Sequence, residues 1–172
     1  MLSKTFRVLI HADPETLWSV LIDRTKNPGR YQVGITETRI SSPGQHSFIR
    51  ESIVHGQSVK ERITTDAHNG EVSELILSHP SFTGALRWKV VPTARQSPVA
   101  PVYLECHAEL VPIDLVISGV LRGEAESSID IERELDTIRE AAEAKARIPL
   151  GGDNRYNPPE PPRRSEVARG NR

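Results

Sequence analysis

The sequence predicts an α+β domain in which a seven-stranded, curved antiparallel sheet wraps around a long C-terminal helix. Between residues 35 and 112, β-rich segments alternate with turn signals about every 8 to 15 residues, which is typical of an antiparallel meander. Residues 124–147 contain neither Pro nor Gly and repeat apolar side chains at helical spacing. The first strand and two short helices precede this meander.

The first strand and helix are indicated by a change of period near the start of the chain. "FRVLI" alternates apolar and polar residues as a half-buried strand does. Asp13 is suited to cap a helix that begins at Pro14, because proline fits the first helical position. An apolar stripe follows at Leu17, Val20 and Leu21, and Trp18 and Ile22 widen it. "NPG" ends this helix, and a second short helical turn is expected next.

The remaining elements follow in order. The six strands of the meander are "GITETRIS", "SFIRESIV", "SVKERITT", "EVSELILS", "TGALRWKVVP" and "VYLECHAELVP". Residues 113–123 fit either an irregular crossover or a short helix. The stripe of the C-terminal helix is Ile131, Leu135, Ile138 and Ala142.

Length and composition divide the chain into two parts. Residues 1–150 suit one domain with a real core. Residues 151–172 are rich in Pro, Arg and Asn and are predicted to form a disordered tail. A polyproline ligand for an aromatic groove is the alternative, since the tail contains "PPEPP".

The predicted disorder of the tail leads to a test. We expect truncation after Leu150 to leave the midpoint of thermal unfolding nearly unchanged, because the tail has little apolar surface to bury. Differential scanning calorimetry of the two lengths measures this. A drop of several degrees would show that the tail packs against the domain.

Charge and residue usage limit the classes of binding partner, the cofactors and the cellular location that we expect. The chain has 22 basic and 23 acidic residues, which argues against an electrostatic nucleic-acid binder. The six histidines show no HxxxH or HExxH spacing, so no metal site and no cofactor are predicted. The only cysteine, Cys106, fits a reducing compartment. There is no signal-peptide pattern and no membrane-spanning apolar run, so we expect a cytoplasmic protein. We also expect a monomer or a weak dimer.

The order of these elements resembles that of the SRPBCC superfamily, the helix-grip proteins that include START-related lipid-transfer domains and the birch-pollen-allergen family. "ADPETLWSVL" and "DRTKNPGRY" resemble the usual start of these proteins, and the resemblance covers residues 3 to about 147. "RE…G…VKERI" across residues 50–63 resembles the AtaL-like branch, whose role is generally unassigned. The resemblance implies that a ligand occupies a cavity between the sheet and the C-terminal helix.

The hairpin through His55 predicts which side chains line this cavity. A short loop would pair Val54 with Val59 and Arg50 with Ile63. The inward face is then Phe48, Arg50, Ser52, Val54, Val59, Glu61 and Ile63, and the outward face places Glu51 opposite Arg62. Arg50 and Glu61 would be diagonal neighbours, and removal of Glu61 would leave a buried guanidinium unpaired. A satisfied internal ion pair, or a register shifted by one residue, is the plainer interpretation.

The later strands supply the rest of the expected cavity wall. Its residues are Leu86, Trp88 and Val90, then Leu104, Cys106 and Ala108, with Ile131, Leu135 and Ile138 from the helix. Val102 and Leu110 extend the apolar face of the last strand. Trp88 suits the core as well as a ligand-contacting wall. Cys106 points inward as a small hydrophobe with no base beside it in the sequence.

Glu74 has two possible orientations. If it faces inward, it joins Glu61 and favours acid–base chemistry. If Leu75 and Leu77 face inward, Glu74 is solvated, and their apolar bulk favours this second arrangement.

Three functions are compatible with the sequence. The first is binding of an apolar or aromatic small molecule without chemistry. The second is a polyketide cyclase, aromatase or dehydratase-like enzyme, with Glu61 and Arg50 as candidate catalytic residues. The third is a protein–protein adaptor.

Overall fold

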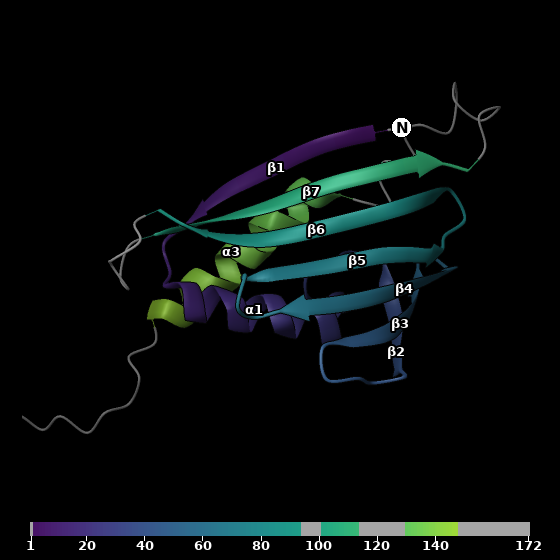
Figure 1. Cartoon of the computed structure of the whole chain (residues 1–172), viewed down its shortest axis with the longest axis horizontal. Helices are drawn as coiled ribbons and strands as arrows, with labels where there is room; N and C mark the ends of the chain where they lie inside the picture. The colour runs from purple at the N-terminus through teal and green to yellow at the C-terminus, as the bar shows by residue number, and fades with distance from the viewer. Residues whose placement is uncertain (1, 94–100, 114–129, 148–172) are drawn as a thin grey trace, which may run out of the picture.

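The structure, a computed structural model, describes residues 2–93, 101–113 and 130–147. All of its strands form one antiparallel sheet in the order β1-β7-β6-β5-β4-β3-β2, as Figure 1 shows. The strands are β1 (Leu2–Ile10), β2 (Ile35–Ser41), β3 (Ser47–Val54), β4 (Gln57–Asp66), β5 (Glu71–Ser78), β6 (Phe82–Pro92) and β7 (Val102–Pro112). β2 to β7 form the predicted meander, and β1 pairs with β7 at its end.

Helices α1 (Pro14–Lys26) and α3 (Ile131–Arg147) lie together on one side of the sheet (Figure 1), and the 3₁₀ helix η1 (Pro28–Arg30) follows α1. α3 packs against β1 and α1. This arrangement confirms the predicted α+β class with its C-terminal helix and its two short helices after the first strand.

The start of α3 differs from the prediction. The helix begins at Ile131, because Asp130 lies outside it and caps it: Asp130 Oδ1 accepts from the amide of Arg133 at 3.0 Å. Residues 124–129, which we expected to be helical, lie outside the described residues, as do residues 114–123 and the tail from residue 151.

The start of α1 is as predicted. The Asp13 carboxylate accepts from the amide of Thr16 at 2.8 Å, and Pro14 occupies the first turn. The side chains of the predicted stripe, Leu17, Val20 and Leu21, are buried. Arg24 continues the same stripe and is fully buried as well, which the sequence interpretation missed.

The helix-facing side of the sheet forms most of the core. The predicted apolar face of β7 is buried along its length, and so are Leu86, Trp88 and Val90 of β6. Ile131, Leu135, Ile138 and Ala142 of α3 pack into the same cluster. The predicted inward faces of these three elements are confirmed.

The β3–β4 hairpin has the predicted faces but a different register. Its turn contains only His55 and Gly56, both at positive φ, so Val54 pairs with Gln57 rather than with Val59. Arg50 therefore lies directly opposite Glu61 instead of diagonal to it, and Lys60 rather than Arg62 lies opposite Glu51. The predicted pairs were wrong by two residues, and an even shift keeps every side chain on its face.

The expected orientation of β5 was wrong. Glu74 has no exposed surface, whereas Leu75 and Leu77 are 43% and 42% exposed. Val72 and Ile76 are the aliphatic residues of this strand that face the core. Burial of Glu74 is possible because two arginines reach it, as described below.

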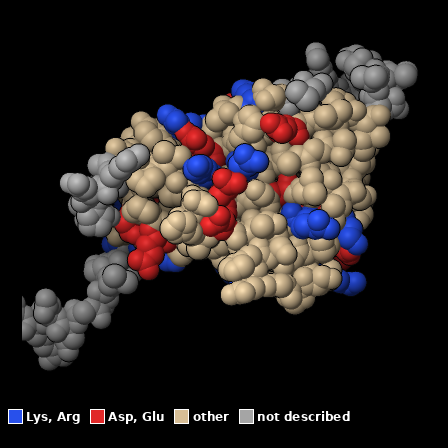
Figure 2. Space-filling model, viewed as in Figure 1, with Lys and Arg blue, Asp and Glu red and all other residues tan. Residues whose placement is uncertain are grey.

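The opposite side of the sheet carries charges of both signs. Figure 2 shows acidic and basic side chains interspersed on this side of the molecule rather than gathered into a patch of one sign. Cross-strand pairs such as Arg7 with Glu105 and Arg87 with Glu71 account for part of this mixing. No helix among the described residues is long and apolar enough to cross a membrane.

Candidate functional site

A buried cluster of five charged side chains joins the sheet to both helices. Its arginines are Arg24 of α1 and Arg50 of β3. Its carboxylates are Glu61 of β4, Glu74 of β5 and Glu134 of α3, and each of the five side chains is buried. Charges are buried at this level only when they are paired and hydrogen-bonded, so the geometry of the cluster decides what it can do.

Arg24 holds two carboxylates from different elements. Its Nη1 and Nη2 donate to Glu74 Oε1 and Oε2 at 2.7 and 3.0 Å, a bidentate pair. Its Nε donates to Glu134. Gln32 Nε2 donates to both oxygens of Glu134 at 2.8 Å. These bonds connect α1, β5 and α3 through one guanidinium.

Arg50 holds the remaining carboxylate and shares Glu74. Its Nε and Nη2 donate to Glu61 Oε2 at 3.0 and 2.8 Å. Nη2 also lies 3.2 Å from Glu74 Oε1, and Nη1 donates to the carbonyl of Thr25 at 3.2 Å. Loss of Glu61 would therefore leave Arg50 with Glu74 as a partner, which revises the expectation drawn from the hairpin alone.

Trp88 completes the surroundings of Glu74. Its indole Nε1 donates to Glu74 Oε2 at 3.1 Å, and the guanidinium carbon of Arg24 lies 4.1 Å from its ring centroid. Both oxygens of Glu74 thus have two donors each. In the part of the chain that the structure describes, no buried side-chain nitrogen or oxygen lacks a hydrogen-bond partner.

The cluster shifts the pKa values of two of its carboxyls in opposite directions. Burial acts to raise the pKa of Glu74, but the charges of Arg24 and Arg50 outweigh it and lower the pKa to about 2. Burial raises the pKa of Glu61 above its ordinary value, and this effect exceeds the opposing charge of Arg50. Of these two carboxyls, Glu61 is therefore the one more readily protonated.

A cavity of about 300 Å³ opens beside the cluster, between β2–β6, the segment after η1 and the start of α3. Its apolar wall is Val33, Ile35, Val54, Val59, Ile76 and Leu86. Its polar wall includes Tyr31, Gln32, Ser52, His55, Glu61 and His79, with Asp130, Arg133 and Glu134 at the helix end. Glu61 and Glu134 belong to both the cavity wall and the buried cluster.

The structure divides the sequence-predicted cavity residues into three groups. Ser52, Val54, Val59, Glu61 and Leu86 line the cavity. Arg50, Ile63, Trp88, Val90, Leu104, Cys106, Ala108, Ile131, Leu135 and Ile138 are buried outside its wall. Phe48 lines a separate hollow of about 240 Å³ near the β2–β3 turn. The cavity therefore lies nearer the β3–β4 turn than the sequence interpretation placed it.

Several lining residues were not foreseen. Val33 and Ile35 follow η1 at the edge of the sheet, and Ile76 lies on the face of β5 that carries Glu74, which we expected to be solvated. His79 follows β5, and its Nδ1 accepts from the amides of Ser81 and Phe82 at 3.0 and 3.1 Å. The alternation of Val72, Glu74 and Ile76 was the available signal for β5.

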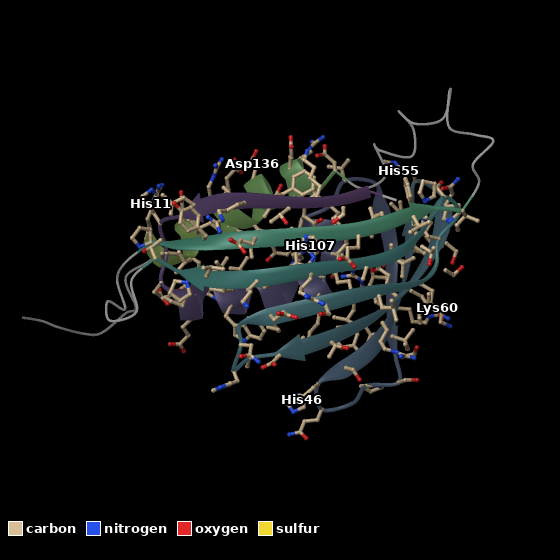
Figure 3. The ribbon with its side chains drawn as sticks, turned by 45° about the horizontal axis from the view of Figure 1, so that its top comes forward. His11, His46, His55, Lys60, His107 and Asp136 are labelled. Carbon is tan, nitrogen blue, oxygen red and sulfur yellow. The ribbon has the colours of Figure 1, made fainter. Side chains whose placement is uncertain are left out.

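The buried thiol and the histidines do not form a reactive centre. Burial raises the pKa of the Cys106 thiol, which disfavours the thiolate that a nucleophile requires. Figure 3 shows His11, His46, His55 and His107 at separate places, His55 at the end of the β3–β4 hairpin. Among the described residues, no group of three or more His, Cys, Asp or Glu side chains could hold a metal ion.

The opposite shifts of Glu74 and Glu61 predict a stability maximum at mildly acidic pH. Glu74 contributes stability that is fully present above its unfolded pKa near 4.5 and is lost as the pH falls toward 2. Glu61 acts with the opposite sign: because its folded pKa is raised, folding becomes less favourable as the pH rises from about 4.5 through that raised value. The charged or titratable groups around Glu61 are Arg24, Arg50, Glu74, Glu134, Arg133, Asp130, Tyr31, His55 and His79.

Denaturant titrations between about pH 2 and pH 8 measure this dependence. We expect Glu61→Gln to remove most of the decline on the alkaline side of the maximum and to leave the acid loss in place. A free energy of unfolding that rises steadily to pH 8 in the unsubstituted protein would contradict the raised pKa of Glu61.

Comparison with known proteins identifies the fold. No family model matches the sequence, and no curated protein matches it either. Among solved structures, the protein TTHA0849 from Thermus thermophilus is similar at a TM-score of 0.64 and 14% identity, over 84% of this chain and 99% of that one. Zhui aromatase/cyclase from Streptomyces sp. R1128 is similar at a TM-score of 0.61 and 16% identity, over 84% and 93%.

A START superfamily protein from Mycobacterium smegmatis is similar at a TM-score of 0.50 and 16% identity, over 84% of this chain and 96% of that one. Likeness at these identities concerns the fold and not the activity. The described elements of this chain are a seven-stranded antiparallel sheet, a helix after the first strand and a C-terminal helix, as in a helix-grip fold. The chain therefore has the helix-grip α+β fold of these solved structures.

Proposed function

We propose that this chain binds an apolar or aromatic small molecule in the cavity beside the buried ion cluster. The observation that carries the proposal is the composition of the cavity wall: six aliphatic side chains form its apolar part, and polar or charged residues, among them Glu61 and Ser52, form the rest. Binding sites for small molecules typically combine apolar surface with polar groups that orient the ligand, and both are present in this wall. The volume of about 300 Å³ lies at the lower end of such sites, which favours a small ligand.

The rigidity of the wall also supports binding. The ion cluster fixes Glu61 and Glu134 through Arg50, Arg24 and Gln32 before any ligand arrives. A preformed site spends less binding energy on ordering side chains than a flexible one does.

Native mass spectrometry of the protein purified from its own host tests the proposal. We expect a co-purifying small molecule that is lost on denaturation. Val54→Trp should abolish it by filling the cavity, whereas Ile53→Trp, on the opposite face of the same strand, should retain it. Retention by both variants would place the molecule elsewhere and contradict the proposal.

A second candidate function is proton transfer within the same cavity, as in a cyclase or dehydratase. The specific observation in its favour is Glu61, a carboxyl in the cavity wall whose pKa burial raises toward the range useful for acid–base work. The aromatase/cyclase among the structurally similar proteins agrees with this candidate. Arg50 is not part of the cavity wall and would act only by positioning Glu61.

A turnover assay with a short polyketone analogue distinguishes the two functions. An enzyme should lose product formation in Glu61→Gln while still binding the analogue. A binding protein should form no product, either unsubstituted or as Glu61→Gln.

A further inference from the structure

We infer that the cavity prefers an apolar molecule that carries a protonated amine, bound with its ammonium group at Glu61 Oε1. This inference rests on the proposed binding function and names the chemical class of its ligand. It follows from the charge balance of the buried cluster and from the position of the unbalanced charge.

The buried cluster carries an unbalanced charge. Two guanidinium groups, Arg24 and Arg50, face three carboxylates, Glu61, Glu74 and Glu134, so one negative charge remains when all five are ionised. An uncompensated charge away from water is costly, and the system gains by acquiring a cation or a proton.

The unbalanced charge lies on Glu61. Glu74 accepts from Arg24, Arg50 and Trp88, and it uses both of its oxygens. Glu134 likewise accepts through both oxygens. Glu61 accepts from Arg50 only through Oε2. Among the described residues, none donates to Glu61 Oε1, and Glu61 lines the cavity.

None of the other described groups that line the cavity supplies a cation to Glu61 Oε1. Burial lowers the pKa of His79, and its Nδ1 accepts from two backbone amides, so its ring is neutral with the proton on Nε2. The Tyr31 hydroxyl donates to Asp23 at 2.8 Å, away from the cluster. Arg133 and His55 are exposed, the His55 ring lies against Gly34, and within the described part of the chain no salt bridge joins either residue to the cluster. The cation that Glu61 lacks is therefore left for a ligand to supply.

An ammonium ligand should also displace a proton. Without a cation in the cavity, the raised pKa of Glu61 lets the cluster reduce its excess charge by protonation. An ammonium at Oε1 favours the ionised carboxylate, so amine binding below this raised pKa releases a proton to the buffer. A neutral ligand has no such effect.

Three probes with one apolar body test the inference: phenylpropylamine, phenylpropanol and phenylpropionate. Isothermal titration calorimetry near pH 7 should show the amine binding at least about tenfold more tightly than the alcohol, with the carboxylate the weakest. Repetition near pH 4.5, the ordinary pKa of a glutamate carboxyl, in buffers of different ionisation enthalpy should show proton release for the amine alone.

Glu61→Gln is the decisive variant, because it keeps an oxygen acceptor for Arg50 and removes the charge. The amine should then lose its advantage over the alcohol, while the affinity of the alcohol changes less than about threefold. Glu51→Gln, on the other face of the sheet, should leave all three affinities unchanged. Circular dichroism of each variant checks that it is folded.

The outcomes separate this inference from the proposed function. Equal or tighter binding of the alcohol by the unsubstituted protein would overturn the preference for a cation and leave the binding function standing. Retention of the amine preference in Glu61→Gln would place the ammonium at another acidic group and overturn the assignment to Glu61. Failure of all three probes to bind would contradict both.

Discussion

Replacing Glu74 by Gln should lower the free energy of unfolding by about 3–5 kcal/mol, the usual cost of breaking a buried charge pair from one side. Glu74 has no exposed surface and accepts from Arg24, Arg50 and Trp88. The amide cannot neutralise either arginine, and its NH₂ group would face N–H donors where the second carboxylate oxygen was. Urea denaturation at pH 7 measures the loss.

Two other glutamates provide matched controls for this substitution. Glu51→Gln should leave the unfolding midpoint nearly unchanged, because Glu51 pairs with Lys60 in a solvent-accessible place. Glu61→Gln should cost clearly less than Glu74→Gln, since it leaves two carboxylates for two arginines and Arg50 keeps Glu74. Equal losses for Glu61→Gln and Glu74→Gln would show that the excess negative charge is not located at Glu61.

Gly84→Ala is the second substitution with a large expected effect. It should lower the free energy of unfolding by about 2–5 kcal/mol, because it combines backbone strain with overpacking. Gly84 has a φ of +131°, where residues with a side chain are strained. An added Cβ would lie 2.0 Å from the carbonyl oxygen of Glu109 on β7, much closer than real atoms approach. The β6–β7 pairing would have to separate locally, and this pairing carries Trp88 and Cys106 in the core.

Gly56→Ala separates the two contributions. Gly56 also has a positive φ, +79°, but an added Cβ would meet nothing within 4 Å. Its cost should be limited to that of the left-handed conformation, about 1–2 kcal/mol. Thermal unfolding of both variants measures the difference, and equal losses would contradict a clash at Gly84.

Elements that depend on local periodicity were predictable from the sequence. The apolar faces of β6 and β7 and the cap at Asp13 follow from patterns within one segment, and the structure has them as expected. The β3–β4 hairpin had the right faces and the wrong pairs, because alternation determines the face and only the turn length determines the partner.

The ion cluster was only partly predictable, because its stability depends on contacts between distant segments. Glu74 was expected to be solvated, since nothing near it in the sequence could compensate a buried carboxylate. Its partners are Arg24 and Arg50, one in a helix and one two strands away. One signal was available: Arg24 extends the apolar stripe of Leu17, Val20 and Leu21 by one helical step.

The position of the cavity was harder still to predict. Its wall combines the end of the β3–β4 hairpin, the residues after η1 and the start of α3, none of which shares a periodic pattern with the others. Its location also depends on where α3 begins. Residues 124–130 have a helix-compatible composition, and the cap at Asp130 is what places Glu134 in the first turn beside Gln32.

Site-specific titration of the glutamate carboxyl carbons by carbon-13 NMR tests the central claim, that a buried cluster leaves its unbalanced charge on Glu61 at the cavity wall. We expect Glu74 to remain ionised down to about pH 2 and Glu61 to titrate above its ordinary value of 4.5. A Glu61 carboxyl that titrates at or below 4.5, or a Glu74 carboxyl that titrates in the ordinary range, would contradict this account.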